Sequence, residues 1–430
     1  MFFLAKYRFI RYNMIENTER KGESIPMKIL IVNAGSSSLK YQLIDMENEE
    51  TLAKGIVERI GMGGEGHADM KVDGKTVCDV VEPIEDHVKA CHLMLGFLTD
   101  PEKGVVKDMK EIGAVGHRVL HGGNKFSESV VINDDVLAAI EEFIPLGPLH
   151  NPANLMGIKA CQEVMPGTPM VAVFDTAFHQ TMPPKAYMYG VPYEYYERLH
   201  VRRYGFHGTS HRFVSKHAAE FMGKKPEEVR MITCHLGNGS SLAAVAYGKC
   251  VDTSMGITPL EGMIMGTRSG VMDPAVIQYI CNNDHLSVDE MLNICNKKSG
   301  LLGISGLSND MRDIEKATFV DHNERAKLAW DMLIYQITKY IGSYIAAMNG
   351  VDAIVFTGGI GENTNKLREQ VCDGLTWMGI QIDHAKNDAM KPGRAADSDL
   401  TAEGSRVKIL VIPTNEEIAI ARDTLELVTK

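Results

Sequence analysis

The feature that most constrains this chain is a strand–turn–strand unit that occurs twice. An apolar run at 28–32 leads into a glycine- and serine-rich turn at 33–40, and a second run at 231–234 leads into a similar turn at 235–242. In both copies a Ser-Ser-Leu sequence carries the chain from the turn into an alternating strand. Two copies of one unit predict two similar domains that face a shared cleft.

Each turn is suited to hold phosphate groups, because it sets backbone N–H groups and hydroxyls at the end of a buried strand. The first turn offers the hydroxyls of Ser36 and Ser38 and the ammonium group of Lys40. A third glycine turn, at 357–363, follows another apolar run. None of the three is a Walker A loop, since Lys40 lacks the GxxxxGK spacing. The alternative is that these turns are only tight connections.

The remaining sequence predicts an α/β fold. Apolar residues over 325–348 follow the 3.6-residue period of a helix, and an apolar strand at 352–356 comes directly afterwards. Such a pair is typical of a parallel α/β unit. Further strands are expected at 39–45, 51–60, 230–235, 242–247, 250–254 and 407–412, and a last amphipathic helix at 418–428.

Composition excludes several classes of function. With 430 residues, 44% of them hydrophobic, the chain can form two domains. Its net charge of −11 argues against non-specific binding to nucleic acid or to an anionic membrane. The 8 cysteines form no CxxC pair and no apolar stretch could span a bilayer, so we expect a cytoplasmic protein with free thiols. Residues 1–26 differ in composition and are expected to be a disordered or non-native extension before Met27, with a targeting segment as the alternative.

Two arginines stand among small residues. Arg118 lies within a His-Arg-Val-Leu-His-Gly-Gly sequence, and Arg268 lies between Gly-Thr and Ser-Gly. Beside phosphate-binding turns, a guanidinium group can clamp the oxygens of a phosphoryl group during its transfer. A solvated turn position is the alternative for either arginine.

Two carboxylates are expected at strand ends. Asp175 follows the apolar run at 169–174, and Glu416 follows the strand at 407–412. The carboxyl ends of parallel strands are where α/β proteins gather ligands, and carboxylates beside phosphates suit Mg²⁺. The alternative is helix capping, because either residue could stabilise the start of the helix that follows it.

Histidines also occur in clusters, with His150 and His179 in short motifs and His207 and His211 close together. A zinc hydrolase would be the competing chemistry. The chain has no HExxH motif, and the Gly-Thr-Ser between His207 and His211 predicts that the two rings do not share a helical face. Some of these histidines are expected only to support loops.

The motifs together resemble the acetate kinase family, within the superfamily of acetate and sugar kinases, heat-shock ATPases and actin. They occur in the order of that family from Met27 to the end of the chain, and their combination is highly specific. The motifs lie at 33–40, 116–123, 148–152, 174–179, 203–211, 235–241, 265–270, 358–363 and 414–417.

The resemblance implies two duplicated ribonuclease H-like domains around a central nucleotide cleft. The first would span 27–175 and include the C-terminal helix at 417–430, and the second would span 176–416 and carry the adenosine site. The implied reaction is ATP + acetate ⇌ ADP + acetyl phosphate, by direct in-line transfer in a homodimer that has no nucleic-acid or membrane partner.

The resemblance also implies roles for individual residues. Mg²⁺, with Mn²⁺ as an alternative, would be organised by Asn33 and Glu416, and Arg118 would grip the acetate carboxylate. Asp175 matches the acid/base of the family, which we interpret first as an organiser of metal-bound water. The other catalytic residues would be His150, His207 and Arg268. Phosphates would contact Ser36, Ser38, Lys40, His235, Leu236, Gly237, Asn238 and Gly239. Adenosine would contact Asp310, Met311, Arg312, Gly359, Ile360, Gly361, Glu362 and Asn363. The acetate methyl group would contact Leu120, Leu149, Phe206 and Pro259.

Two positions depart from the family pattern. Val271 stands where many relatives carry an acidic residue, and Met311 stands where an aromatic residue is common beside the adenine. The nearest alternative function is a propionate or broader short-chain carboxylate kinase, although Leu120 would narrow the acceptor pocket relative to valine. An actin-like or chaperone-like ATPase switch is the alternative from another class, and it would hydrolyse ATP slowly without any carboxylate acceptor.

Overall fold

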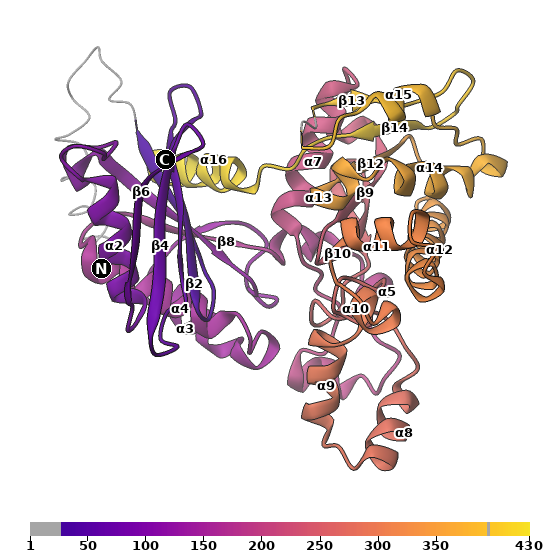
Figure 1. Cartoon of the computed structure of the whole chain (residues 1–430), viewed down its shortest axis with the longest axis horizontal. Helices are drawn as coiled ribbons and strands as arrows, with labels where there is room; N and C mark the ends of the chain where they lie inside the picture. The colour runs from indigo at the N-terminus through magenta and orange to yellow at the C-terminus, as the bar shows by residue number, and fades with distance from the viewer. Residues whose placement is uncertain (1–26, 394–395) are drawn as a thin grey trace, which may run out of the picture.

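The computed structural model describes residues 27–393 and 396–430, so the expectations for residues 1–26 lie outside the described part of the chain. Figure 1 shows two halves, each built on its own β-sheet, with the last helix returning to the N-terminal half. The predicted α/β fold with two related halves is therefore confirmed. Among the described helices, none combines the length and the apolar content that a bilayer crossing requires.

The N-terminal half contains an 8-stranded sheet in the order β5-β4-β3-β2-β1-β6-β8-β7. Strands β1 and β2 form an antiparallel hairpin, whereas β1, β6 and β8 run parallel to one another. The strand expected at 51–60 ends at Glu58, because Arg59 adopts a φ of 62° that breaks the extended backbone. The strands are β1 Lys28–Ala34, β2 Ser38–Asp45, β3 Glu50–Glu58, β4 Glu65–Val72, β5 Lys75–Pro83, β6 Ile112–Val119, β7 Val130–Val131 and β8 Met170–Phe174.

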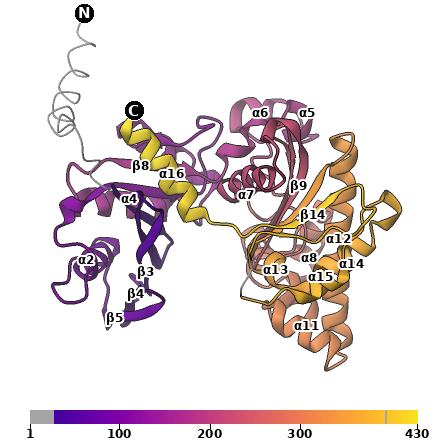
Figure 2. The same ribbon diagram turned by 90° about the horizontal axis from the view of Figure 1, so that it is seen from above.

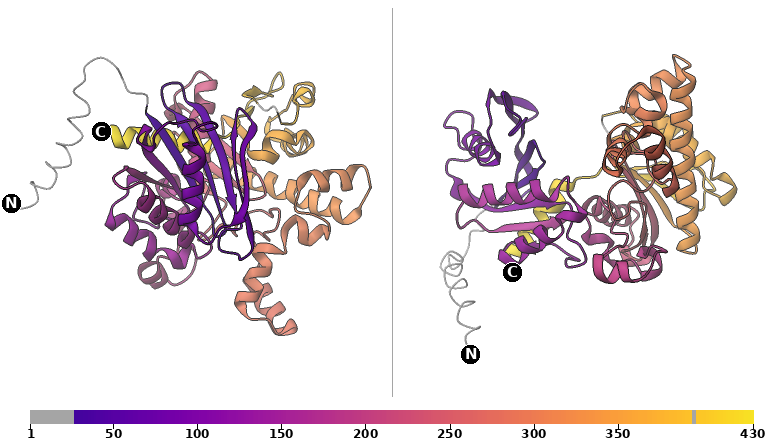
Figure 3. Two further views of the ribbon diagram at one scale, coloured as in Figure 1. Left: turned by 60° about the vertical axis from the view of Figure 1, so that its left-hand side comes forward. Right: turned by 90° about the horizontal axis from the view of Figure 1, so that it is seen from below.

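Helices cover both faces of this sheet, which explains why β1 is apolar without a break from Ile29 to Val32. Leu30 and Val32 belong to the core shared with α2 (His87–Leu98) and α4 (Asn151–Val164). Ile29 and Ile31 belong to the core on the opposite face, where the C-terminal α16 (Glu416–Thr429) packs. Figure 3 shows this sheet and the second half from two further directions.

The second half repeats the strand–turn–strand unit in a 6-stranded sheet with the order β11-β10-β9-β12-β14-β13. Strands β9 and β10 form the hairpin, and β9, β12 and β14 run parallel. The long α12 (Glu324–Ala347) packs on one face and α7 (Gly208–Phe221) on the other. The strands are β9 Arg230–Leu236, β10 Ser240–Ala246, β11 Lys249–Thr253, β12 Ala353–Thr357, β13 Ser398–Asp399 and β14 Lys408–Val411.

The third glycine turn differs from the prediction, because residues after β12 form the short helix α13 (Gly358–Asn363). The carboxylate of Glu362 accepts a hydrogen bond from the Gly358 N–H at 2.9 Å and so supports the first turn of this helix. The remaining helices are α3 Asp134–Glu142, α5 Pro184–Tyr187, α6 Glu194–Leu199, α8 Pro274–Asp284, α9 Val288–Lys297, α10 Gly300–Ser305, α11 Met311–Phe319, α14 Asn365–Asp373 and α15 His384–Ala389, with short 3-10 turns that include η3 at Ala177–Thr181.

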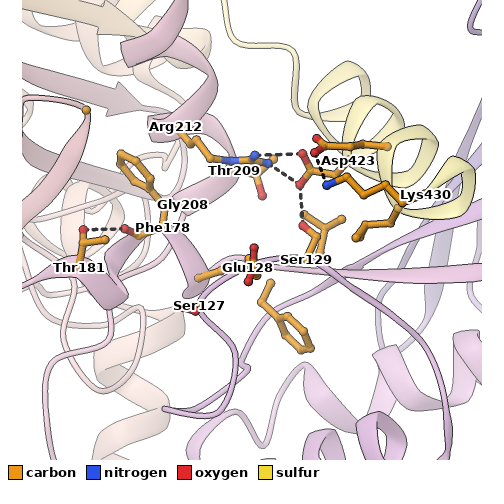
Figure 4. Close-up of a pocket in the computed structure, with 16 residues that line it drawn as sticks. Ser127, Glu128, Ser129, Phe178, Thr181, Gly208, Thr209, Arg212, Asp423 and Lys430 are labelled. Atoms are coloured by element: carbon orange, nitrogen blue, oxygen red, sulfur yellow. Dashed lines mark hydrogen bonds and ion pairs between the residues drawn. The ribbon is translucent and has the colours of Figure 1, made fainter. Parts of the chain in front are cut away.

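The halves are joined at two places. The chain leaves the first sheet after β8 and returns to it through α16, which packs on β1 and β6 and also contacts α7 (Figure 2). Between α7 and α16 lies a cavity of about 210 Å³, where both guanidinium ends of Arg212 bind Asp423 at 2.9 and 2.6 Å (Figure 4). None of the site residues expected from the sequence lines this cavity.

Candidate active site

A largely buried ion pair lies at the cleft between the two halves. Arg118 near the end of β6 donates from Nε to Oδ1 of Asp175 at 3.1 Å and from Nη2 to Oδ2 at 2.6 Å. The Asp175 side chain is fully buried, whereas a quarter of the Arg118 side chain (25%) is exposed. The charges of Asp175 and Glu416 raise the pKa of Arg118. The pair therefore fixes a permanently charged guanidinium group at the edge of the cleft.

A small cavity of about 170 Å³ adjoins this ion pair. It brings together three residues of the first glycine turn, Asn33, Ser38 and Lys40, with Arg118 and His150. Ser36 is exposed and does not line it. The cavity therefore combines hydroxyl, amide, ammonium and guanidinium groups, a set that suits an anion and its counter-cation.

A residue that the sequence did not single out holds this cavity in shape. The buried Asn154 of α4 donates from Nδ2 to the carbonyl of Ala34 at 2.9 Å and accepts from the Leu120 N–H at 3.0 Å. It thus ties the first turn to the segment after β6. A single asparagine in a helical stretch gives no sequence signal for such a role.

A second, more apolar cavity of about 330 Å³ lies beside the first, and Leu120 and His150 line both. Its lining includes Leu149 and Pro259, which were expected at an acceptor site, and also Arg268. Leu149 is 57% exposed at the surface of this region.

Phe206 does not line the apolar cavity but packs against Leu120, which does. It is fully buried and packs in a small core with Leu120, Met255 and Met265. His179 is buried as well, and its Nε2 lies 2.9 Å from the carbonyl oxygen of Phe206. His179 is therefore one of the histidines that support a loop.

Three histidine rings meet on the second-half side of the cleft. His207, at the start of α7, stacks on His235 with ring centroids 4.2 Å apart. The prediction that His207 and His211 do not share a face is wrong, because Nδ1 of His207 and Nε2 of His211 lie 2.8 and 2.7 Å from the same Ser241 hydroxyl. Helix α7 begins at Gly208, so the Gly-Thr-Ser segment is its first turn and not a break.

Burial keeps this cluster of rings uncharged. Desolvation lowers the pKa of His207 and His211 well below the usual value, and neighbouring histidines lower both further. Desolvation also lowers the pKa of His235 to about 4. Nδ1 of each of the three rings lies within hydrogen-bond distance of a serine or threonine hydroxyl. In residues 27–393 and 396–430, the only close group of potential metal ligands is Glu369, Asp373 and His384, which includes none of these histidines.

The second glycine turn lies under Arg268 and His207. A β-carbon at Gly239 would come within 3.3 Å of Nη1 of Arg268 and 3.6 Å of Nε2 of His207. Nη1 of Arg268 also donates to the carbonyl of Pro259 at 3.3 Å, which links the turn to the apolar cavity. The turn itself is closed by the hydrogen bond from Ser240 Oγ to the carbonyl of Gly237 at 2.9 Å. Backbone and guanidinium groups thus gather at one point.

The segments expected to bind adenosine lie in the second half. Asp310 caps α11 and pairs with Arg312, whose side chain is 89% exposed. Met311 is buried in the core of this half, so its side chain is not free to stack on a base. Asn363 binds the carbonyl of Gly359 within α13, and Ile360 lies against the core. Asn238 of the second turn accepts from Nδ2 of Asn309 at 3.0 Å, which joins the phosphate turn to this region.

The two residues expected at a metal ion lie on the first-half side. Glu416 occupies the first turn of α16, and Asn33 is the last but one residue of β1, at the cavity that Arg118 also lines. Burial raises the pKa of Glu416, Arg118 opposes this effect, and the negative charges of Asp175 and Glu417 add to it, so that the pKa lies at about 7. Amide and carboxylate oxygens are hard ligands, so this donor set fits Mg²⁺ or Mn²⁺.

Comparison with known proteins identifies the family. A model described as the acetokinase family matches residues 28–422. The acetate kinase of Thermotoga maritima is 58% identical over 405 residues, which cover 94% of this chain and 99% of that protein. The crystal structure of Porphyromonas gingivalis acetate kinase has a TM-score of 0.89 at 46% identity, covering 94% of this chain and all (100%) of that chain. A propionate kinase from Francisella tularensis has a TM-score of 0.85 at 42% identity, with 93% and 100% covered. The chain therefore belongs to the acetokinase family.

Proposed function

We propose that this protein catalyses ATP + acetate ⇌ ADP + acetyl phosphate. Membership of the acetokinase family makes it a kinase with a carboxylate acceptor. The observation that carries the specific reaction is that Leu120 and His150 line both the polar cavity at the first glycine turn and the neighbouring apolar cavity. A terminal phosphate and a short apolar acid can therefore meet at one boundary.

The arrangement addresses the main barrier to this reaction, which is the approach of one anion to another. Acetate is already ionised at pH 7, so it needs no strong base to become a nucleophile. Arg118, held by Asp175, would bind its carboxylate, and Arg268 would bind the phosphoryl oxygens as their charge spreads during in-line transfer. His207 would donate a hydrogen bond to the same group.

Mg²⁺, or Mn²⁺ in its place, would supply charge neutralisation at the phosphates. Asn33 and Glu416 would hold it, and Asp175 would orient its water ligands more than it would carry a proton. The raised pKa of Glu416 supports this role, because a bound cation stabilises the charged form of a carboxylate that is buried beside other negative charges.

The nucleotide would lie across both halves of the cleft. Lys40 and the turn at 235–239 would hold its phosphates, and the segments at 310–312 and 359–363 would hold adenosine. For Met311 we propose contacts from its backbone, since its side chain is buried. The division into domains at 27–175 with 417–430 and at 176–416 remains our proposal, as do a homodimer and a cytoplasmic location without nucleic-acid or membrane partners.

Discrimination between short carboxylic acids is modest, because one methylene group changes binding by only about 1–3 kcal/mol. We favour acetate over propionate, since Leu120 is larger than valine at the wall of the apolar cavity. We expect kcat/KM to fall from acetate to propionate to butyrate. In Leu120→Val, the ratio of kcat/KM for acetate to kcat/KM for propionate should fall by about tenfold at most. Steady-state kinetics with the three acids checks this. A higher kcat/KM for propionate in the unmodified protein would favour the alternative acceptor.

The reaction itself is tested by a hydroxamate assay for acetyl phosphate with ATP, Mg²⁺ and acetate. We expect product only when all three are present. An ATPase switch would instead release phosphate slowly without any carboxylate, and it would leave Arg118 and His150 without a role. Light scattering coupled to size-exclusion chromatography measures the oligomeric state separately.

A further inference from the structure

Three buried side chains beside His207 have no role in the proposed reaction. They form a chain of short contacts from Thr233 to His211, from His211 to Ser241 and from Ser241 to His207. The Oγ1 atom of Thr233 lies 2.7 Å from Nδ1 of His211, Nε2 of His211 lies 2.7 Å from Oγ of Ser241, and that oxygen lies 2.8 Å from Nδ1 of His207. Thr233, His211 and Ser241 are all 0% exposed.

The direction of these hydrogen bonds is limited by the number of protons. His211 is neutral, because burial holds its pKa far below the usual value, so one ring nitrogen donates and the other accepts. Ser241 has one proton and two histidine partners, so it donates to one and accepts from the other. Only two arrangements of protons allow all three hydrogen bonds between Thr233 and His207, and the donors point in opposite directions in the two.

One of the two arrangements leaves a buried donor without an acceptor. If the protons run from His207 toward Thr233, His211 donates to Thr233 and the Thr233 proton must find another acceptor. In the described part of the chain Oγ1 of Thr233 makes no hydrogen bond other than the one to His211. If the protons run the other way, Thr233 donates to His211, His211 donates to Ser241, and Ser241 donates to His207. Burying an unsatisfied hydroxyl donor is costly, so the second direction is favoured.

We infer that Thr233, His211 and Ser241 are positioning residues that hold His207 as the neutral tautomer with its proton on Nε2. Because Nδ1 of His207 then accepts from Ser241, its Nε2 must carry the hydrogen. That nitrogen faces the second glycine turn, where a β-carbon at Gly239 would lie 3.6 Å from it and 3.3 Å from Nη1 of Arg268. The hydrogen bonds from Thr233 to His207 therefore direct a neutral N–H donor to the point where the Arg268 guanidinium group lies.

This inference rests on the proposed role of His207. It explains how an uncharged ring can donate a hydrogen bond to the phosphoryl group. Two features disfavour the imidazolium form of His207, namely its burial and its contact with His235 at 4.2 Å between ring centroids. A donor that is fixed before the reaction needs no reorganisation when charge develops on the phosphoryl oxygens. The positive charge at this point would come from arginine and metal, and the hydrogen bond from His207.

The test is a long-range ¹H–¹⁵N correlation spectrum of the full chain labelled with ¹⁵N-histidine, at pH 7 without ligands, with His207→Gln used for assignment. We expect His207 to show a protonated Nε2 and an unprotonated Nδ1. Ser241→Ala and Thr233→Val should change this pattern, and Thr233→Ser should keep it, because the serine hydroxyl restores the donor. Ser215→Ala is the matched control, since Ser215 is a buried serine of α7 whose hydroxyl binds the Arg212 carbonyl at 3.1 Å.

Kinetics separate this inference from the proposed function. With the tautomer lost, we expect kcat of Ser241→Ala to fall by about 10²-fold, as for removal of one transition-state donor, and KM for acetate to change by less than about threefold. Thr233→Ser and Ser215→Ala should retain kcat.

A wild-type His207 protonated on Nδ1, or a pattern unchanged in both Ser241→Ala and Thr233→Val, would overturn the inference. A changed pattern with unchanged kcat would instead overturn the role that we propose for His207. Thermal melting of each variant, with Thr233→Ser as the conservative case, identifies any variant that does not fold.

Discussion

The Arg118–Asp175 pair is the residue-scale feature on which the site depends most. Replacement of Asp175 by Asn keeps the shape but turns one acceptor oxygen into an NH₂ group that faces a donor of Arg118. Arg118 then loses its fixed position and the site loses a negative charge. We expect KM for acetate and the half-saturating concentration of Mg²⁺ each to rise about tenfold, in assays that vary each ligand separately. Unchanged dependence on Mg²⁺ would contradict the role of Asp175 at the metal.

A second residue-scale prediction concerns pH. Burial lowers the pKa of His121 to about 4, and its Nδ1 accepts from the Gly123 N–H at 3.0 Å. Because the folded pKa lies below the unfolded value near 6.5, the folded state gains stability above pH 6.5 and loses it as the pH falls toward 4. We expect the free energy of unfolding to fall by roughly 1–3 kcal/mol over this range through His121 alone. In urea titrations at pH 7 and pH 5, His121→Asn should lose less stability on acidification than the unmodified protein. An equal loss would exclude His121 as a contributor.

Single residues also mark the limit of what the sequence could predict. Arg118, Asp175, His207 and Arg268 stand in recognisable motifs, so the sequence identified them as candidates. Their pairing was not visible, because Arg118 and Asp175 are 57 positions apart and their contact depends on the parallel alignment of β6 and β8. The contact of Ser241 with both His207 and His211 was missed for a related reason. It depends on how α7 packs against β9 and β10, which no local pattern encodes.

At the scale of elements, α7 and α16 form the contact that joins the two halves behind the site. Both helices begin at the cleft, with His207 before α7 and Glu416 in the first turn of α16. The Arg212–Asp423 pair then links them, and Ser129 also donates to Asp423 at 2.5 Å (Figure 4). A change in the angle between the halves must move these helices relative to each other, so this contact restrains the motion.

We therefore expect Asp423→Asn to make the angle between the halves more variable. Glu49→Gln is the matched control, because Glu49 makes the same two-point contact with Arg422 of α16 but within the first half. Both substitutions should cost about 1 kcal/mol in stability, since each weakens one ion pair whose arginine lies at the surface, and Asp423→Asn should cost the more because Asp423 is only 14% exposed. Small-angle scattering of both variants and of the unmodified protein, with and without ADP, should show a larger radius of gyration than that of the unmodified protein only for Asp423→Asn without nucleotide. Equal profiles for the two variants would show that this ion pair does not restrain the halves.

The elements were predicted well where a periodic pattern was long. The helix expected at 325–348 is α12 (Glu324–Ala347), and the paired hairpins were found from their apolar runs. The segment after β12 was missed because its glycines indicate a turn, whereas contacts from Glu362 to Gly358 and Thr414 hold it as a helix. The Thr414 contact comes from a strand end 52 positions away, which local sequence cannot report.

At the scale of the whole molecule, the duplication could be predicted from the sequence, but the return of α16 to the first sheet could not be derived from residue patterns alone. Ile418, Ile420 and Val428 bury one face of that sheet against Ile29 and Ile31. Their amphipathic spacing predicts a helix with a buried side, but it does not say which of two sheets receives it. That assignment came only from the resemblance to a family.

The placement of α16 predicts that the N-terminal half cannot fold without the end of the chain. Each buried side chain of α16 contributes about 1.5–3 kcal/mol, so loss of three of them removes an amount comparable to the whole stability of a typical domain, about 5–15 kcal/mol. We expect a fragment of residues 27–175 to lack cooperative thermal unfolding, and the same fragment joined through a Gly-Ser linker to residues 413–430 to regain it. Substituting Ile418 and Ile420 by Ser in the joined fragment is the control, because it keeps the length and removes the apolar face. Cooperative unfolding of 27–175 alone, followed by circular dichroism, would mean that this half is stable by itself and that α16 serves mainly to carry Glu416 to the cleft.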